Sequence, residues 1–301
     1  MQVPHYSIHN ADNIQNQLRV NLYRQLIWVA YVCIHVDDEE VSVHEARKGF
    51  KRLRALVRLF RNGIGEPTYR RLNLYFRNKA RRLAPYRDLS VNLQLINRLI
   101  NESQNNQETK PLIALKSHLL KSYDELQSEG HLAVLLKNVA DEVLDYAPQV
   151  FSLKVKPLGT SMLITGVGDI YLCGRKEYQK VIYAPTSENF HQLRKRVKYL
   201  KYHMDLLEIW GGGTLGNNEK LADEVADLLG LEHDAAILLQ LVELHASLFT
   251  SGEKNHWLRL IKQNMDRYHA KAWPILAYIY FDKPKVFLRR MQLALDCGLR
   301  V

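Results

Sequence analysis

Cysteine is scarce in this chain of 301 residues, which contains only Cys33, Cys173 and Cys297. An odd number of widely separated thiols provides neither a disulfide framework nor a Cys-x-x-Cys metal site. We therefore predict three free cysteines, buried as small hydrophobic side chains.

Long apolar runs and targeting signals are also missing. No apolar stretch approaches the ~18 residues of a membrane helix, and the opening MQVPHYSIHN lacks the basic then apolar pattern of a signal peptide. The 15 glycines and 9 prolines are too few for a fibrous or disordered chain, while 47% hydrophobic residues are enough for real cores. We expect a soluble, cytoplasmic protein that does not bind membranes.

Alternating β-branched segments are rare, and almost every segment has helical periodicity. The first half predicts helices at residues 11–36, 41–61, 66–83, 88–104, 109–128 and 131–147. The second half predicts helices at residues 161–183, 187–209, 218–229, 232–249, 254–281 and 284–299. The fold class is therefore predicted to be all-α, with two antiparallel helical bundles.

Glycine and proline mark the expected breaks between and within these helices. The segment GGGTLGNN at 211–218 and Gly230 are expected to interrupt helices, and Pro274 is expected to kink or split one. The least periodic stretch, residues 150–160, predicts a boundary between a first unit at 1–155 and a second at 156–301.

One pattern occurs twice, as VHEARKGFKRLRALVRLF at 43–60 and FHQLRKRVKYLKYHMDLL at 190–207. In both copies a histidine is followed by basic residues at +3, +4, +7 and +10, offsets that share one side of a helix. The basic side of the first copy contains His44, Arg47, Lys48, Lys51, Arg54 and Arg58. That of the second contains His191, Arg194, Lys195, Lys198 and Lys201. Each helix is expected to bury its apolar side and display the basic one. We call the basic side of each copy its basic stripe.

The positive charge is concentrated in the first copy and the residues after it. Residues 43–87 contain 14 lysines and arginines against two acids, Glu45 and Glu66, whereas the whole chain has a net charge of +10. Ordinary helix surfaces mix both signs, because like charges repel one another. This concentration indicates a polyanionic partner.

Two aspartates hold equivalent places after the two stripes. RDLSVNL at 87–93 aligns with HDAAILL at 233–239, which pairs Asp88 with Asp234. We expect each to begin a helix and cap its free N–H groups. The alternative is that each pairs with an arginine of its stripe and fixes the direction of that arginine.

These motifs resemble the CHAD family, named for a histidine-bearing α-helical domain. The matching segments are VHEARKGFKRLR at 43–54, LAPYRDLSV at 83–91, FHQLRKRVKYLKY at 190–202 and LLGLEHDAAIL at 228–238. The resemblance implies two pseudo-symmetric helical bundles, related as an internal repeat, whose basic helices line a shared groove that binds inorganic polyphosphate. It also leads us to expect association with polyphosphate granules.

The same resemblance implies particular phosphate contacts. They are His44, Arg47, Lys51, Arg52 and Arg54 in the first copy, and His191, Arg194, Lys195, Lys198 and Lys201 in the second, with Tyr199 in the place of Arg52. From the same basic segment we add Lys48, Arg58 and Arg87. Asp205 and Glu208 stand where the first copy has Arg58 and Arg61, which predicts a weaker second half.

Other functions remain open at this stage. A basic stripe can also grip the backbone of single-stranded nucleic acid, or act as a general polyanion binder, so nucleic acid is expected to be a weaker competitor. His44 or His191 can in principle take part in phosphoryl transfer. However, GGGTLGNNEK lacks the Gly-Lys-Ser/Thr ending of a nucleotide loop, and His233-Asp234 alone does not define a metal site. A phosphohydrolase or phosphotransferase is the least favoured alternative, and we expect no catalytic residue, metal or cofactor.

Overall fold

The computed structural model describes residues 6–9, 12–103, 109–127, 130–156, 159–211 and 213–298, and all regular elements within them are helices. The all-α prediction is confirmed. The helices of the first part are α1 (Ile14–His35), α2 (Glu39–Leu59), α3 (Arg61–Ile64), α4 (Glu66–Arg82), α5 (Ala84–Glu102), α6 (Lys110–Gln127), α7 (His131–Tyr146) and the 3-10 helix η2 (Ala147–Ser152). Those that follow are α8 (Thr160–Tyr183), α9 (Ser187–Gly211), α10 (Gly213–Leu244), η3 (Ala246–Leu248), α11 (Ser251–Ile279) and α12 (Pro284–Gly298).

Local chemistry explains where several helices begin. The Asp38 side chain accepts hydrogen bonds from the backbone N–H groups of Glu40 (2.9 Å) and Val41 (3.1 Å) at the start of α2. Thr250 and Glu253 form a reciprocal capping box at the start of α11. Gly65, with φ of 79°, provides the left-handed turn before α4. Asp38 therefore fixes the residue at which α2 begins.

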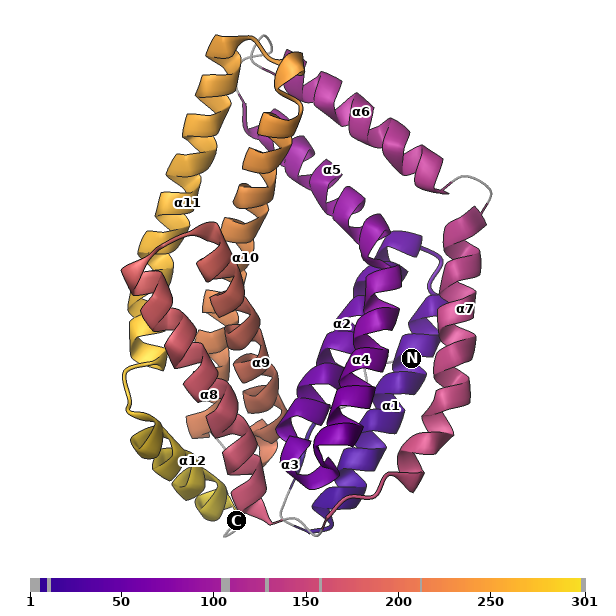
Figure 1. Ribbon diagram of the computed structural model, residues 1–301, viewed down its shortest axis with the longest axis vertical. Helices are drawn as coiled ribbons and strands as arrows, with labels where there is room; N and C mark the ends of the chain where they lie inside the picture. The colour runs from indigo at the N-terminus through magenta and orange to yellow at the C-terminus, as the bar shows by residue number, and fades with distance from the viewer. Residues whose placement is uncertain are drawn as a thin grey trace.

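Two hydrophobic cores hold the helices together. The larger core joins α1, α2, α4, α7, α8, α9 and α12, together with parts of α10 and α11. The smaller core joins Leu95 and Ile96 of α5 and Leu112 of α6 to Leu238 of α10 and Trp257 of α11. Figure 1 shows α5 and α6 reaching from the α1, α2, α4 and α7 side to the ends of α10 and α11. Each core therefore combines helices from both sides of residue 155, and the division into repeats at 1–155 and 156–301 stays a prediction.

The predicted interruption of the helix at Gly230 is wrong. α10 runs without a break from Gly213 to Leu244, so the expected helices at 218–229 and 232–249 are one. A glycine inside a helix costs only about 1 kcal/mol, and α10 buries Val225, Leu229 and Val242. Tertiary packing outweighs this local penalty. The expected loop at 211–218 is also mostly wrong, since α10 begins at Gly213, while Gly212 lies outside the described residues.

Pro274 does not split its helix either, because α11 continues from Ser251 to Ile279 around it. The flanking residues Ala272 and Leu276 are buried in the larger core. Their burial holds α11 together where the proline ring removes one backbone hydrogen bond.

The three cysteines are free, but their burial differs from the prediction. Cys33 is buried, Cys173 is partly buried and Cys297 is exposed. Cys297 lies one residue from the end of α12, at the edge of the packed structure, so nothing covers it as a core residue would be covered. In the described part of the chain, no helix has the length and apolarity to cross a bilayer.

Close packing between α8 and α2 gives a stability prediction. A Cβ atom added at Gly166 would lie 2.2 Å from the backbone carbonyl oxygen of Leu59. We expect Gly166→Ala to lower the free energy of unfolding by about 1–3 kcal/mol, because backbone must move to relieve the clash. The matched control is Gly252→Ala, since a Cβ there meets nothing within 4 Å. Urea denaturation of both variants checks this prediction, and equal stability would contradict it.

Candidate anion-binding site

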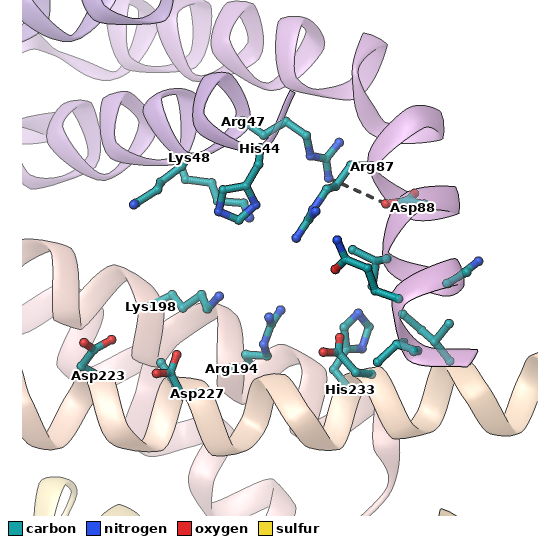
Figure 2. A pocket seen from close by; sticks show the side chains of 18 of the residues that line it. His44, Arg47, Lys48, Arg87, Asp88, Arg194, Lys198, Asp223, Asp227 and His233 are labelled. Atoms are coloured by element: carbon teal, nitrogen blue, oxygen red, sulfur yellow. Dashed lines mark ion pairs between the residues drawn. The ribbon is translucent and has the colours of Figure 1, made fainter. Parts of the chain in front are cut away.

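A cavity of about 440 Å³ lies between α2, α5, α9 and α10. Figure 2 shows side chains of α2 and α5 facing those of α9 and α10 across it. The charged and histidine side chains that line the cavity are His44, Arg47, Lys48, Lys51, Arg87, Asp88, Arg98, Arg194, Lys198, Lys201, Asp223, Asp227, His233 and Asp234. Eight of these are lysine or arginine and four are aspartate, so the lining is positive overall.

On the α2 side, the direction of Arg47 is fixed by two contacts. Its Nη1 donates a hydrogen bond to the carbonyl oxygen of Ala80 at 2.9 Å, and its Nη2 lies 4.0 Å from Oδ1 of Asp88. Figure 2 shows the Arg47–Asp88 pair at the cavity wall. Arg87, the neighbour of Asp88, lies 3.5 Å from Glu40. The arginines are therefore oriented, and their remaining N–H groups are available to an anion.

The prediction that Asp88 and Asp234 cap helices is wrong. α5 begins at Ala84, which places Asp88 one turn inside it, and α10 contains Asp234 in its interior. The alternative reading fits Asp88, which pairs with Arg47. Asp234 likewise interacts electrostatically with Arg194.

On the α9 side, acids from α10 offset part of the positive charge. Asp223 forms an ion pair with Lys201, and Asp227 acts electrostatically on Lys198. Asp205 and Glu208, which the sequence suggested would weaken this half, do not line the cavity. The side that carries more aspartates is indeed the second one, but its acids come from α10 and not from the stripe.

Two lysines in the cavity have lowered pKa values. Desolvation by the surrounding protein and the charges of Lys198, Arg47, Arg194 and Arg87 lower the pKa of Lys51 to about 7. Desolvation and the charge of Arg194 lower the pKa of Lys198 to about 8, against the opposing effect of Asp227. The Lys51 side chain nevertheless keeps substantial solvent exposure, because the cavity is open. The carboxylates of the protein therefore do not fully compensate the positive charge of the cavity.

Three histidines lie at or beside the cavity. The rings of His191 and His233 stack with centroids 4.4 Å apart. Desolvation, together with His191, Arg194, Lys195 and Lys198, lowers the pKa of His233 to about 4. Desolvation and neighbouring cations also lower the pKa of His44 and of His191. At neutral pH these imidazoles are therefore uncharged hydrogen-bonding groups.

The cavity brings together eight of the fourteen residues predicted from the sequence, namely His44, Arg47, Lys48, Lys51, Arg87, Arg194, Lys198 and Lys201. The other six lie outside its lining, and other contacts explain their positions.

Arg54 donates from Nε to Asn73 Oδ1 on α4 at 3.0 Å. The Arg58 guanidinium lies 4.6 Å from the ring centroid of Tyr199 and 5.6 Å from that of Tyr69. Arg54, Arg58 and Tyr199 are therefore engaged between α2, α4 and α9, beyond the cavity.

Arg52 lies on another side of α2, where its guanidinium is 5.9 Å from the ring centroid of Tyr6. Lys195 is exposed beside Gln192, and His191 stacks behind His233. None of Arg52, Lys195 and His191 lines the cavity.

Several residues line the cavity although the sequence did not predict them as site residues, including Arg98, Gln94, Asp223, Asp227 and His233. Arg87, Val91, Gln94 and Arg98 recur at helical spacing along one face of α5, a signal that would have identified Arg98. Asp223 and Asp227 gave no such signal, because they lie outside both stripes. Within the described residues, no group of three or more His, Cys, Asp or Glu side chains is arranged to hold a metal ion.

Comparison with known proteins supports the assignment suggested by these motifs. No protein in a curated set matches the chain. The family model for the CHAD domain matches residues 28–243, which include every residue that lines the cavity. The chain therefore belongs to the CHAD domain family.

Proposed function

We propose that this protein binds inorganic polyphosphate in the cavity between α2, α5, α9 and α10, without chemical conversion of the ligand. The observation that carries the proposal is the convergence of eight lysines and arginines from α2, α5 and α9 on one open cavity. Membership of the CHAD family supports it. Association with polyphosphate granules in the cytoplasm is part of the proposal.

The chemistry of the cavity suits a chain of phosphates. Polyphosphate carries closely spaced negative charges and no bases. A site that binds it therefore needs several aligned cations and few hydrogen bonds of fixed direction. The oriented Arg47 offers a planar fork to phosphate oxygens, whereas Lys51 and Lys198 act as mobile point charges. A bound polyanion would also relieve the mutual repulsion that lowers the pKa values of these lysines.

The histidines fit a binding role. Because burial and adjacent cations keep His44, His191 and His233 uncharged at neutral pH, each can donate one hydrogen bond to a phosphate oxygen. The aspartates near them act on cavity cations, as Asp88 does on Arg47 and Asp234 on Arg194.

The test is a competitive titration at fixed ionic strength with long-chain polyphosphate, single-stranded DNA, RNA and heparin. We expect polyphosphate to bind most tightly, with steep weakening as salt increases. Equal affinity for all four would contradict selective binding and indicate a general polyanion binder. Release of orthophosphate during incubation would contradict the non-enzymatic proposal, so phosphate should be measured in the same samples.

A further inference from the structure

The cavity does not account for the positive charge of α4. In its 17 residues this helix has six lysines and arginines and one acid, Glu66. Carboxylates neutralise part of this charge, since Glu66 pairs with Arg70, and Glu142 of α7 pairs with Lys79 and Arg82.

Arg71, Arg77 and Arg81 remain as unneutralised charges, and Arg77 and Arg81 lie one helical turn apart. Both are exposed, and no carboxylate in the described part of the chain forms an ion pair with either. Unneutralised cations four residues apart on one helix repel each other. Their arrangement costs stability and calls for an external anion.

The register between α2 and α4 shows where these arginines lie. Along the two antiparallel helices, Arg47 contacts Ala80, Arg54 contacts Asn73 and Arg58 lies over Tyr69. Arg77 and Arg81 follow Asn73 by four and eight residues. At about 100° per residue they therefore lie about 40° and 80° around α4 from Asn73, on the exposed flank beside the contact with α2.

The basic side of α2 leads from the cavity to this flank. Lys51 lines the cavity, and Arg54 lies on the same side of α2 one turn farther along. Arg54, Arg77 and Arg81 thus form a basic track outside the cavity, from the contact between α2 and α4 onto the exposed flank of α4. The track is separate from the lining, which contains none of the three.

We propose that this basic track is a second binding segment, which holds the part of a long linear polyphosphate that extends out of the cavity. The inference rests on the proposed function and adds a preference for long chains to it. Because opposite charges attract over roughly 8–10 Å in physiological salt, a chain in the cavity long enough to reach the track gains further contacts at little entropic cost.

The surroundings of the track favour polyphosphate over a nucleic acid. Tyr69 and Phe76 of α4 are buried, and Tyr75 is stacked on Tyr146 of α7 with centroids 4.4 Å apart. These rings are used in packing, so α4 offers no aromatic platform for bases. The track therefore offers a ligand positive charge without aromatic stacking.

The test compares Arg77→Glu/Arg81→Glu with a matched control, Arg259→Glu/Lys262→Glu on α11, where both cations are also exposed. The probes are tripolyphosphate and polyphosphate of about 100 units, titrated at fixed salt. We expect the α4 variant to lose about tenfold in affinity for the long chain and less than twofold for tripolyphosphate, because only the long chain reaches the track. The control should bind both probes as the unmodified protein does.

Two outcomes would overturn the proposal. One is an α4 variant that binds the long chain as tightly as the α11 control does, and the other is an equal loss for both probes, which would indicate a general field effect. The milder Arg77→Gln/Arg81→Gln variant, checked by circular dichroism, gives the same comparison if charge reversal disturbs folding. If the unmodified protein binds neither probe, the proposed function is wrong and so is the proposal of a second binding segment. If the unmodified protein binds polyphosphate, the comparison of the variants tests the second binding segment by itself.

Discussion

Lys51→Glu/Lys198→Glu should weaken polyphosphate binding by about 100-fold or more. Both lysines line the cavity, one from α2 and one from α9, so the double change reverses charge on both sides at once. The change adds two carboxylates where an anionic ligand would lie, and like charges at short range repel strongly. Isothermal titration with long-chain polyphosphate measures the loss.

The fold should survive this substitution. Neither lysine forms an ion pair with a carboxylate among the described residues, and the crowding of cations that lowers both pKa values would be relieved. Lys121→Glu/Lys137→Glu, on the exposed faces of α6 and α7, is the control with the same change in net charge. Unchanged affinity in the cavity variant, or the same loss in the control, would place the binding site elsewhere.

Much of the site follows from helical periodicity alone. The spacing of Arg47 and Lys51, and of Arg194 and Lys198, places each pair on the polar side of an amphipathic helix. The apolar sides, including Phe50 and Val197, are buried as expected. Local sequence is sufficient here because one helix face must enter the core, and this leaves the basic face outward.

Periodicity could not define the limits of the site. Arg54 and Arg58 share the stripe with Lys51, yet Asn73 and Tyr69 of α4 and Tyr199 of α9 engage them outside the cavity. Which part of a stripe lines a cavity depends on how neighbouring helices cross it, and that is a property of tertiary packing. The acids of α10 were missed for the same reason, since only the antiparallel packing of α9 and α10 places Asp223 beside Lys201.

The interruptions of helices were also overestimated from local signals. Gly230 and Pro274 are unfavourable in isolated helices, but α10 and α11 bury apolar side chains on both sides of them. Burying one large apolar side chain contributes about 1.5–3 kcal/mol, which equals or exceeds the penalty for a glycine and offsets that for a proline. Glycine and proline are therefore least reliable as predictors of a helix end where a long helix spans a core.

Polyphosphate affinity should decrease by about 100-fold between about pH 6 and about pH 9. In the free protein, desolvation and the charges of Lys198, Arg47, Arg194 and Arg87 lower the pKa of Lys51 to about 7. Desolvation and Arg194 lower that of Lys198 to about 8. A bound polyanion favours the charged lysines and raises both pKa values, so binding takes up protons. Affinity is therefore highest below about pH 7, where both lysines are already charged, and decreases as pH rises through their free-state pKa values.

Lys51→Arg separates this effect from a general dependence on pH. An arginine stays charged throughout this range and keeps a cation at the same position. We expect the variant to bind as tightly as the unmodified protein at about pH 6 and roughly 30-fold more tightly at about pH 9, with a shallower profile. Titration calorimetry in two buffers of different ionisation enthalpy should show less proton uptake on binding near pH 8. Identical profiles and identical proton uptake for the two proteins would show that Lys51 does not titrate with the ligand, and would remove it from the binding site.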